Sequence, residues 1–207
     1  MMKRFLFTCL ILTVSLFTAM GQPKTDHIKT ALLIVDIQDF YFPGDGPGLV
    51  NVIPASLNAR EILQAFRDKK QLVVHVKHKA VKGGEIHKNV APIAGEKVIT
   101  KTEVNSFQNT DLLEYLKKNE ITRLVIIGMQ THLCLEAATR AGHDFGFECV
   151  VVQDACATKD VKYGDKIVKA EDVHYSTLAT INNTYGKVID LKTFKENQDK
   201  YLFQKLN

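Results

Sequence analysis

The sequence predicts an α/β fold of three layers, in which a mostly parallel central sheet lies between two layers of helices. Three observations lead to this prediction: short apolar runs recur along the chain, helix-like segments separate them, and no repeat or linker divides the chain. Short apolar runs are typical of strands buried on both faces, and their alternation with helices is typical of parallel sheets. The 207 residues, 45% of them hydrophobic, suffice for one domain with a full core.

The predicted elements follow one another in a regular order. Strands are expected at 31–35, 72–76, 98–100, 124–127, 150–152 and 187–191. Helices are expected at 51–69, 110–118, 132–145 and 170–182, with a short helix after the last strand. Two stretches rich in glycine and proline, 41–48 and 81–95, are predicted to be loops that shape a binding site.

The first residues resemble a signal peptide. Lys3 and Arg4 precede an apolar run at 5–17, and small residues at 19 and 21 suit cleavage before Gln22. A retained membrane anchor is the alternative, but a spanning helix needs roughly 20 apolar residues and this run is shorter. We therefore expect a signal peptide at 1–21 and a domain at 22–207, exported to the periplasm or secreted, without membrane attachment after cleavage.

The charge of the mature chain excludes some partners. Removal of Lys3 and Arg4 lowers the formal net charge from +4 to +2, and the remaining lysines are scattered among carboxylates. A charge this small, without a dense basic run, does not predict nucleic-acid binding. A small-molecule substrate is expected as the partner. A homo-oligomer is possible, but no pattern identifies its interface.

The cysteines of the mature chain predict free thiols. Cys134, Cys149 and Cys156 remain after cleavage, and an odd count leaves at least one thiol unpaired. Cys149 and Cys156 flank a predicted strand, and seven extended residues span about 23 Å, which is too far for a disulfide. No cysteine or histidine pattern of zinc spacing is present, so no structural metal is expected.

Polar residues follow three of the predicted strands. Asp36, Lys101 and Cys134 come at or near strand ends, where open parallel sheets bind their ligands. Taken singly, each also fits a structural role: a helix cap, a surface lysine and a buried thiol. Together they suit nucleophilic catalysis. The start of a helix favours the thiolate of Cys134, Asp36 accepts the thiol proton, and Lys101 lowers the pKa of both groups.

Three motifs in this order are similar to a known family. They are LIVDIQDF at 33–40, Lys101 with Asn105-Ser106-Phe107, and GMQTHLC at 128–134. The chain resembles the isochorismatase-like cysteine hydrolases from residue 30 to about 195. The resemblance implies a three-layer α/β/α fold, an Asp36, Lys101 and Cys134 triad, and a cis peptide between Met129 and Gln130. It also implies an oxyanion hole formed by the amides of Gln130 and Cys134.

The resemblance implies hydrolysis of a small amide, ureido or ester-like substrate through a thioester on Cys134, without an organic cofactor. Two alternatives stay open: hydrolysis of a vinyl ether without a covalent intermediate, as by isochorismatase itself, and a non-catalytic binding module. Nicotinamidases of the family bind a metal through Asp-x-His and a further histidine. The segment 75–80 has no such aspartate, so no metal is predicted, and His78 and His87 are expected at the rim of the site.

Residues beside the motifs are the predicted substrate contacts. They are Gln38, Phe42, Asn105 and Phe107. The two phenylalanines suit either an apolar pocket wall or the core, and the two polar residues suit contact with Asp36 or with the substrate. Cys156 is expected to be a buried thiol, with a reversible disulfide to Cys134 as the alternative.

Overall fold

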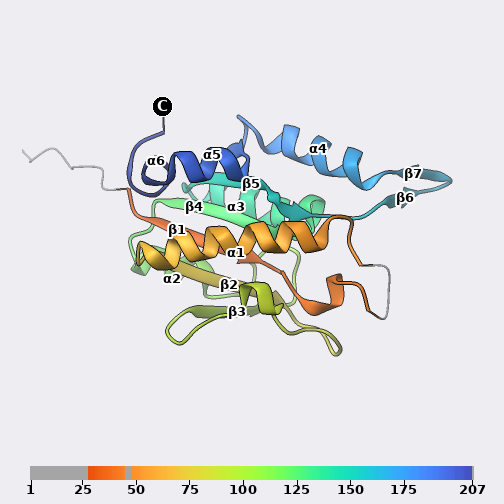
Figure 1. Ribbon diagram of the computed structural model, residues 1–207, viewed down its shortest axis with the longest axis horizontal. Helices are drawn as coiled ribbons and strands as arrows, with labels where there is room; N and C mark the ends of the chain where they lie inside the picture. The colour runs from red at the N-terminus through yellow and green to blue at the C-terminus, as the bar shows by residue number, and fades with distance from the viewer. Residues whose placement is uncertain (1–27, 45–47, 207) are drawn as a thin grey trace, which may run out of the picture.

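The structure is a computed structural model that describes residues 28–44 and 48–206 (Figure 1). Its centre is a sheet of six strands in the order β3-β2-β1-β4-β5-β8, and every neighbouring pair is parallel. The strands are β1 (Thr30–Val35), β2 (Leu72–His78), β3 (Lys97–Lys101), β4 (Arg123–Met129), β5 (Glu148–Ala157) and β8 (Lys187–Ile189). The signal-peptide prediction falls on residues outside the described part of the chain.

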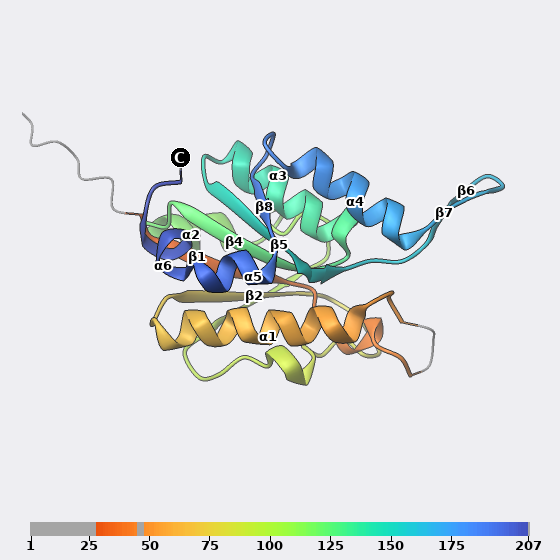
Figure 2. The same ribbon diagram turned by 45° about the horizontal axis from the view of Figure 1, so that its top comes forward.

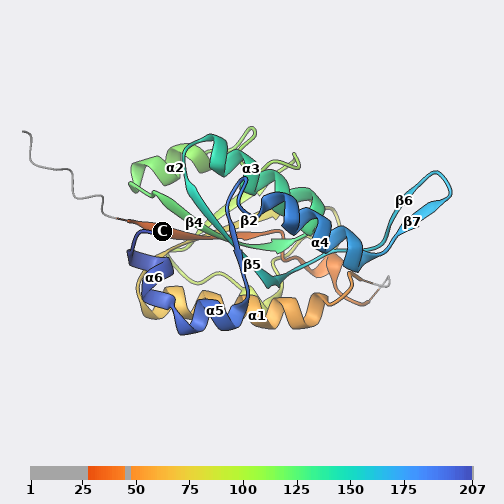
Figure 3. The ribbon, with the colours of Figure 1, turned by 90° about the horizontal axis from the view of Figure 1, so that it is seen from above.

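Helices cover both faces of the sheet, which confirms the three-layer prediction. Figure 3 shows α1 (Val52–Asp68), α5 (Leu191–Glu196) and α6 (Gln198–Phe203) on one face. On the other face lie α2 (Leu112–Lys118), α3 (Glu136–Asp144) and α4 (Ala170–Ile181). Short 3-10 turns occur at Asp39–Tyr41 and Lys88–Val90. In the described residues, no helix has both the length and the apolar character needed to span a membrane.

The sequence of β1 explains why the sheet has two cores. Every residue of this strand is buried, and successive side chains of a strand point to opposite faces. Leu32 and Ile34 pack into the core beneath α1, whereas Leu33 and Val35 pack into the core beneath α2 and α3. The continuous apolar run is therefore what a strand between two helical layers requires.

Besides a longer β5 and a second terminal helix, the structure differs from the predicted elements in three places. The last strand ends at Ile189 rather than at 191, because the Asp190 carboxylate accepts a hydrogen bond from the amide of Thr193 and caps α5. The helix expected from 132 begins with a wider π-helical turn at Thr131–Leu135. An antiparallel hairpin, β6 (Val161–Tyr163) and β7 (Lys166–Val168), follows β5 and was not predicted.

Gly128 lets the ends of β1 and β4 approach each other. Its φ is +134°, and a Cβ atom at this position would overlap the backbone carbonyl of Val35. Only glycine avoids both the strained backbone and the collision. The close approach places the residue after Val35, Asp36, beside the turn that follows β4.

The first and last described residues lie near the amino ends of the strands, away from their carboxyl ends. Thr30 starts β1, and its hydroxyl donates a hydrogen bond to the carbonyl of Leu202 in α6 (2.8 Å). The carboxyl ends of the strands are therefore away from both ends of the described chain (Figure 1).

Candidate active site

Asp36, Lys101 and Cys134 meet at the carboxyl edge of the sheet. Asp36 follows β1, Lys101 ends β3, and Cys134 lies in the π-helical turn after β4. The Lys101 Nζ atom is 2.8 Å from Asp36 Oδ2 and 3.1 Å from Cys134 Sγ. The side chains of Asp36 and Lys101 are fully buried. The structure thus brings together the three residues that the motifs predicted.

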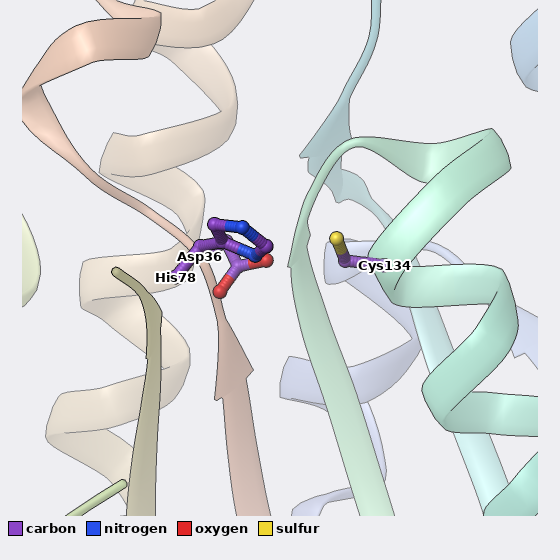
Figure 4. Close-up of side chains that lie close together, drawn as sticks. All are labelled: Asp36, His78 and Cys134. Carbon is purple, nitrogen blue, oxygen red and sulfur yellow. The ribbon is translucent and has the colours of Figure 1, made fainter. Parts of the chain in front are cut away.

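His78 completes the cluster from the end of β2. Figure 4 shows its ring beside the Asp36 carboxylate, with the Cys134 sulfur directed toward both from the start of the helix. The His78 Nδ1 atom is 3.3 Å from Lys101 Nζ, and the same ammonium donates to the backbone carbonyl of Glu103 at 3.0 Å. Acceptors on several sides therefore fix the position of the ammonium.

Burial controls the protonation of this site. It raises the pKa of Asp36 above the ordinary value of 3.8, and the nearby Lys101 charge offsets this only in part. Burial, followed by the negative charge of Asp36, raises the pKa of Cys134 to about 11. Lys101 lowers the pKa of both groups, as expected, but in the resting protein its effect on Cys134 is smaller than that of burial. With a pKa of about 11 the thiol is protonated at neutral pH, because burial and the Asp36 charge together outweigh the attraction of Lys101.

The backbone before Cys134 has the form that the resemblance implied. The peptide bond between Met129 and Gln130 is cis, and both residues are buried. Asp36, directly after the neighbouring strand β1, adopts a left-handed conformation with φ of 51°, which is uncommon outside glycine and occurs often at functional sites. The role of the Gln130 and Cys134 amides in binding an oxyanion stays a prediction.

Gln38 forms hydrogen bonds with the backbone instead of the predicted contact with Asp36 or a substrate. It is fully buried, and its side-chain amide donates to the carbonyls of His78 (2.9 Å) and Gly84 (2.7 Å). Its Oε1 atom accepts from the amide of His78 (2.7 Å). Both N–H groups of the side-chain amide thus donate to backbone carbonyls, so no N–H group remains to bind Asp36 or a substrate. The structure makes Gln38 a residue that positions His78 and the loop at 81–95.

The two predicted aromatic contacts have different positions. Phe107 is buried in the core beneath α2 and α3, where its ring packs against Phe145 and Phe147, and its role as a pocket wall stays a prediction. Phe42 is half-buried and stacks on His87, with ring centroids 3.6 Å apart. Asn105 accepts a hydrogen bond from the amide of Phe107 through Oδ1 (3.0 Å), which stabilises the turn after β3.

Tyr41 is a site residue that the sequence analysis did not single out. Its hydroxyl accepts a hydrogen bond from Gln130 Nε2 at 3.4 Å. Burial, with smaller contributions from the charges of Asp36 and Cys134, raises the pKa of Tyr41 to about 12. Its place in the loop at 41–48, five residues after Asp36, was the only signal in the sequence.

The cluster has the donor types of a metal site, but a cation already lies among them. One atom each of Asp36, His78 and Cys134 lies within 4.8 Å of the others. The Lys101 ammonium forms an ion pair with Asp36 and hydrogen bonds with His78 and Cys134. A metal ion would have to displace it, so these residues fit an ammonium better than a metal.

Three free thiols occur in the described part of the chain, at Cys134, Cys149 and Cys156. Cys149 and Cys156 do not bridge each other, as the spacing predicted. The Cys156 thiol is buried and donates to the carbonyl of Val152 (3.3 Å). A reversible disulfide between Cys156 and Cys134 stays a prediction.

The parallel sheet and the buried acid, lysine and thiol at its carboxyl edge define the class of α/β cysteine hydrolases. The family profile of the isochorismatase domain matches residues 30–192, and the chain belongs to this family.

Relatives agree with this assignment. The uncharacterized isochorismatase family protein YddQ of Bacillus subtilis is 40% identical over 178 residues, which cover 81% of this chain and 99% of that protein. The crystal structure of an isochorismatase-type hydrolase from Oleispira antarctica has a TM-score of 0.77 and 36% identity, and the match covers 80% of this chain and 95% of that one. A streptothricin hydrolase from Streptomyces noursei is 30% identical over 159 residues, or 70% of this chain and 62% of that protein. The protein is a hydrolase of this family.

Proposed function

We propose that the protein hydrolyses a small amide or ureido compound through a thioester on Cys134. The observation that supports this most is the position of the Lys101 ammonium, 2.8 Å from Asp36 and 3.1 Å from Cys134. One buried cation then holds an acid and a thiol close enough to exchange a proton. The family assignment adds that the reaction at this site is a hydrolysis.

The raised pKa values suggest how the nucleophile is activated. In the resting protein the thiol is neutral, and the raised pKa of Asp36 makes its carboxylate a stronger base than an ordinary aspartate. As Sγ attacks the carbonyl carbon, its proton passes to Asp36. Lys101 stabilises the negative charge that develops, and backbone amides at Gln130 and Cys134 bind the oxyanion.

Asp36 then serves both halves of the reaction. The protonated carboxyl group donates its proton to the leaving nitrogen as the C–N bond breaks, which leaves an acyl group on Sγ. Water replaces the amine, Asp36 takes one proton from it, and the hydroxide attacks the thioester. As the C–S bond breaks, Asp36 returns this proton to Sγ and restores the thiol; the products are an amine and a carboxylic acid, or a carbamic acid from a ureido substrate.

Gln130 supports an amide-like substrate. Its side-chain Oε1 atom is buried and has no hydrogen-bond partner among the described residues, whereas Nε2 of the same group donates to Tyr41. An unpaired buried acceptor is costly unless a ligand supplies a donor. An N–H group of an amide or urea supplies that donor, whereas a simple ester does not.

Trapping the intermediate tests the proposal. A panel of small amides, ureido compounds and matched esters is screened for hydrolysis, and the best substrate is used with hydroxylamine present. A thioester gives a hydroxamate, whereas direct attack by water does not. Hydroxamate should form with the wild type and with Cys149→Ala, and should be absent with Cys134→Ala. Turnover that persists in Cys134→Ala without hydroxamate would instead show direct attack by water and contradict the thioester.

We also propose that the domain is exported and that the signal peptide is cleaved between Gly21 and Gln22. The apolar run at 5–17 supports export. So does a relative from Verticillium dahliae, the secreted isochorismatase effector Isc1, which is 28% identical over 175 residues. Intact mass of the protein recovered from the periplasm or the medium should correspond to a chain that starts at Gln22. A full-length mass in the cytoplasmic fraction would contradict export.

A further inference from the structure

The hairpin of β6 and β7, here called the arm (residues 161–168), projects from the body of the molecule. Figures 1 and 2 show it reaching away from the sheet beyond the amino end of α4. Its two strands pair from Val161 with Val168 to Tyr163 with Lys166, and Gly164 and Asp165 form the turn. The catalytic proposal does not use this segment.

The arm exposes apolar side chains on both faces. Because side chains alternate along a strand, Val161, Tyr163 and Val168 share one face, and Ile167 lies on the other. Tyr163 is 88% exposed and Ile167 is 61% exposed. A two-stranded hairpin is marginally stable in water by itself, so such an arm indicates a surface that becomes covered.

The base of the arm is fixed to the body. Asp160 accepts a hydrogen bond from the amide of Ala170 (2.8 Å), the first residue of α4, and pairs with Lys169 (2.9 Å). These contacts set the direction of the arm relative to α4 before any partner binds. A preoriented arm loses less conformational freedom on association than a flexible one.

A cavity of about 610 Å³ lies beside this base, between the amino ends of α1 and α4 and the end of β5. Its lining is acidic and partly apolar, and includes Val50, Pro54, Asp154, Glu171, Tyr175 and Asp190. No lysine or arginine is among the described residues that line it. His174 also lines it, and burial lowers the pKa of its imidazole, so the ring is neutral at pH 7.

The arm has the complementary charge. Lys162 and Lys166 are both exposed, and neither is in an ion pair within the described residues. Their positive charges flank Tyr163 and Ile167 and outnumber the single carboxylate, Asp165 in the turn, so the arm is apolar with a net positive charge. The cavity is acidic and bordered by Val50 and Tyr175, which are 50% and 57% exposed. Charge complementarity of this kind selects partners and fixes their orientation.

We propose that the arm of one copy docks into the cavity of a second copy, and that the exchange is reciprocal. Because the cavity lies at the base of the arm, a two-fold rotation lets both arms engage at once and closes the assembly as a dimer. The turn at 131–135 borders this cavity, since Thr131 Oγ1 is 2.9 Å from His174 Nδ1. The docked arm would therefore lie near the segment that carries Cys134.

Charge reversal in trans tests this arrangement. One variant, Lys162→Glu with Lys166→Glu, reverses the arm. The other, Gln153→Lys with Glu171→Lys, adds two cations to the cavity. Each homodimer then loses its complementary pairing, whereas a mixed dimer of the two variants regains it at both contacts. The double change Lys117→Glu with Lys118→Glu, on α2, is the control with the same change in charge as the arm variant.

Sedimentation velocity of the wild type should give a dimer at micromolar concentrations. Each double variant alone should dissociate at least about tenfold more readily, their equimolar mixture should recover the dimer, and the α2 control should behave as the wild type. Circular dichroism checks that all variants are folded. A monomeric wild type, a dimer indifferent to the arm changes, or a mixture of two monomeric variants that stays monomeric would overturn the proposal.

Discussion

The two ends of β4 both bury charge, with opposite results. Arg123 opens the strand, and its fully buried guanidinium donates to Glu148 (2.8 Å) and to the backbone carbonyls of Tyr201 (2.8 Å) and Gln204 (2.6 Å). Cys134 follows the other end, where Asp36 has one cation beside it and burial raises the pKa of both the acid and the thiol.

The difference shows how one strand can have a permanent charge that stabilises the fold at one end and groups that exchange a proton for catalysis at the other. Arginine stays ionised, and acceptors surround it, so the amino end of β4 holds a fixed charge that binds α6 to the sheet. At the carboxyl end, burial is only partly compensated, so a proton is readily exchanged between Asp36 and Cys134. Changes at the first end should affect stability, and changes at the second should affect turnover.

The largest expected effect is that of Cys134→Ala on turnover. Removing the nucleophile should lower kcat by about 10⁴-fold or more, as in other enzymes with a covalent step. Because the change removes only the sulfur atom and its one hydrogen bond with Lys101, the free energy of unfolding should fall by no more than about 1–2 kcal/mol. Steady-state rates on the best amide and urea denaturation measure the two quantities. A large loss of stability would contradict this division of roles.

Arg123→Met should have the converse effect. It leaves Glu148 without its cation and three carbonyls near α6 without their donor, so we expect a loss of about 3 kcal/mol in the free energy of unfolding. The kcat of the folded fraction should stay within about twofold, because Arg123 lies at the opposite end of the strand. Unfolding in urea and activity at low temperature test both statements together.

The pH dependence of turnover sharpens the comparison. Asp36 must be ionised to accept the thiol proton, so kcat/KM should fall as the pH drops through its pKa, by about tenfold per pH unit at the limit. Since burial raises this pKa above 3.8, the loss should begin at a higher pH than for an exposed aspartate. A rate profile flat down to pH 4 would show that Asp36 is not the base.

The smallest effect is expected for an ion pair at the surface. Lys69 and Asp199 are 3.0 Å apart, with 42% and 65% of their side chains exposed. Lys69→Met should change the free energy of unfolding by less than about 0.5 kcal/mol, since solvent screens exposed pairs. The same urea measurement as for Arg123→Met then separates the effect of burial from that of charge. An equal loss in both variants would contradict the comparison.

The apolar runs and the helical segments between them were sufficient to predict the sheet and its two helical layers, and the polar residues at the strand ends, with the motifs, predicted the meeting of Asp36, Lys101 and Cys134. Their success follows from topology, since the ends of parallel strands share one edge. The positions of Gln38 and Phe107 could not be predicted, because each depends on how a short turn directs one side chain. Nor could the raised pKa of Cys134, which depends on burial by residues distant in the sequence. The arm has only three residues per strand, too few for a periodic signal.

The hydrogen bond from Thr30 to Leu202 has a practical consequence. It holds the first strand and the last helix together at the amino ends of the strands, away from the candidate active site. Attachment of the protein to a bead, a sensor surface or a carrier through residues near either end of the described chain should therefore leave the carboxyl ends of the strands, where Asp36, Lys101 and Cys134 lie, facing the surrounding solution. The orientation of an immobilised enzyme would follow from the fold itself.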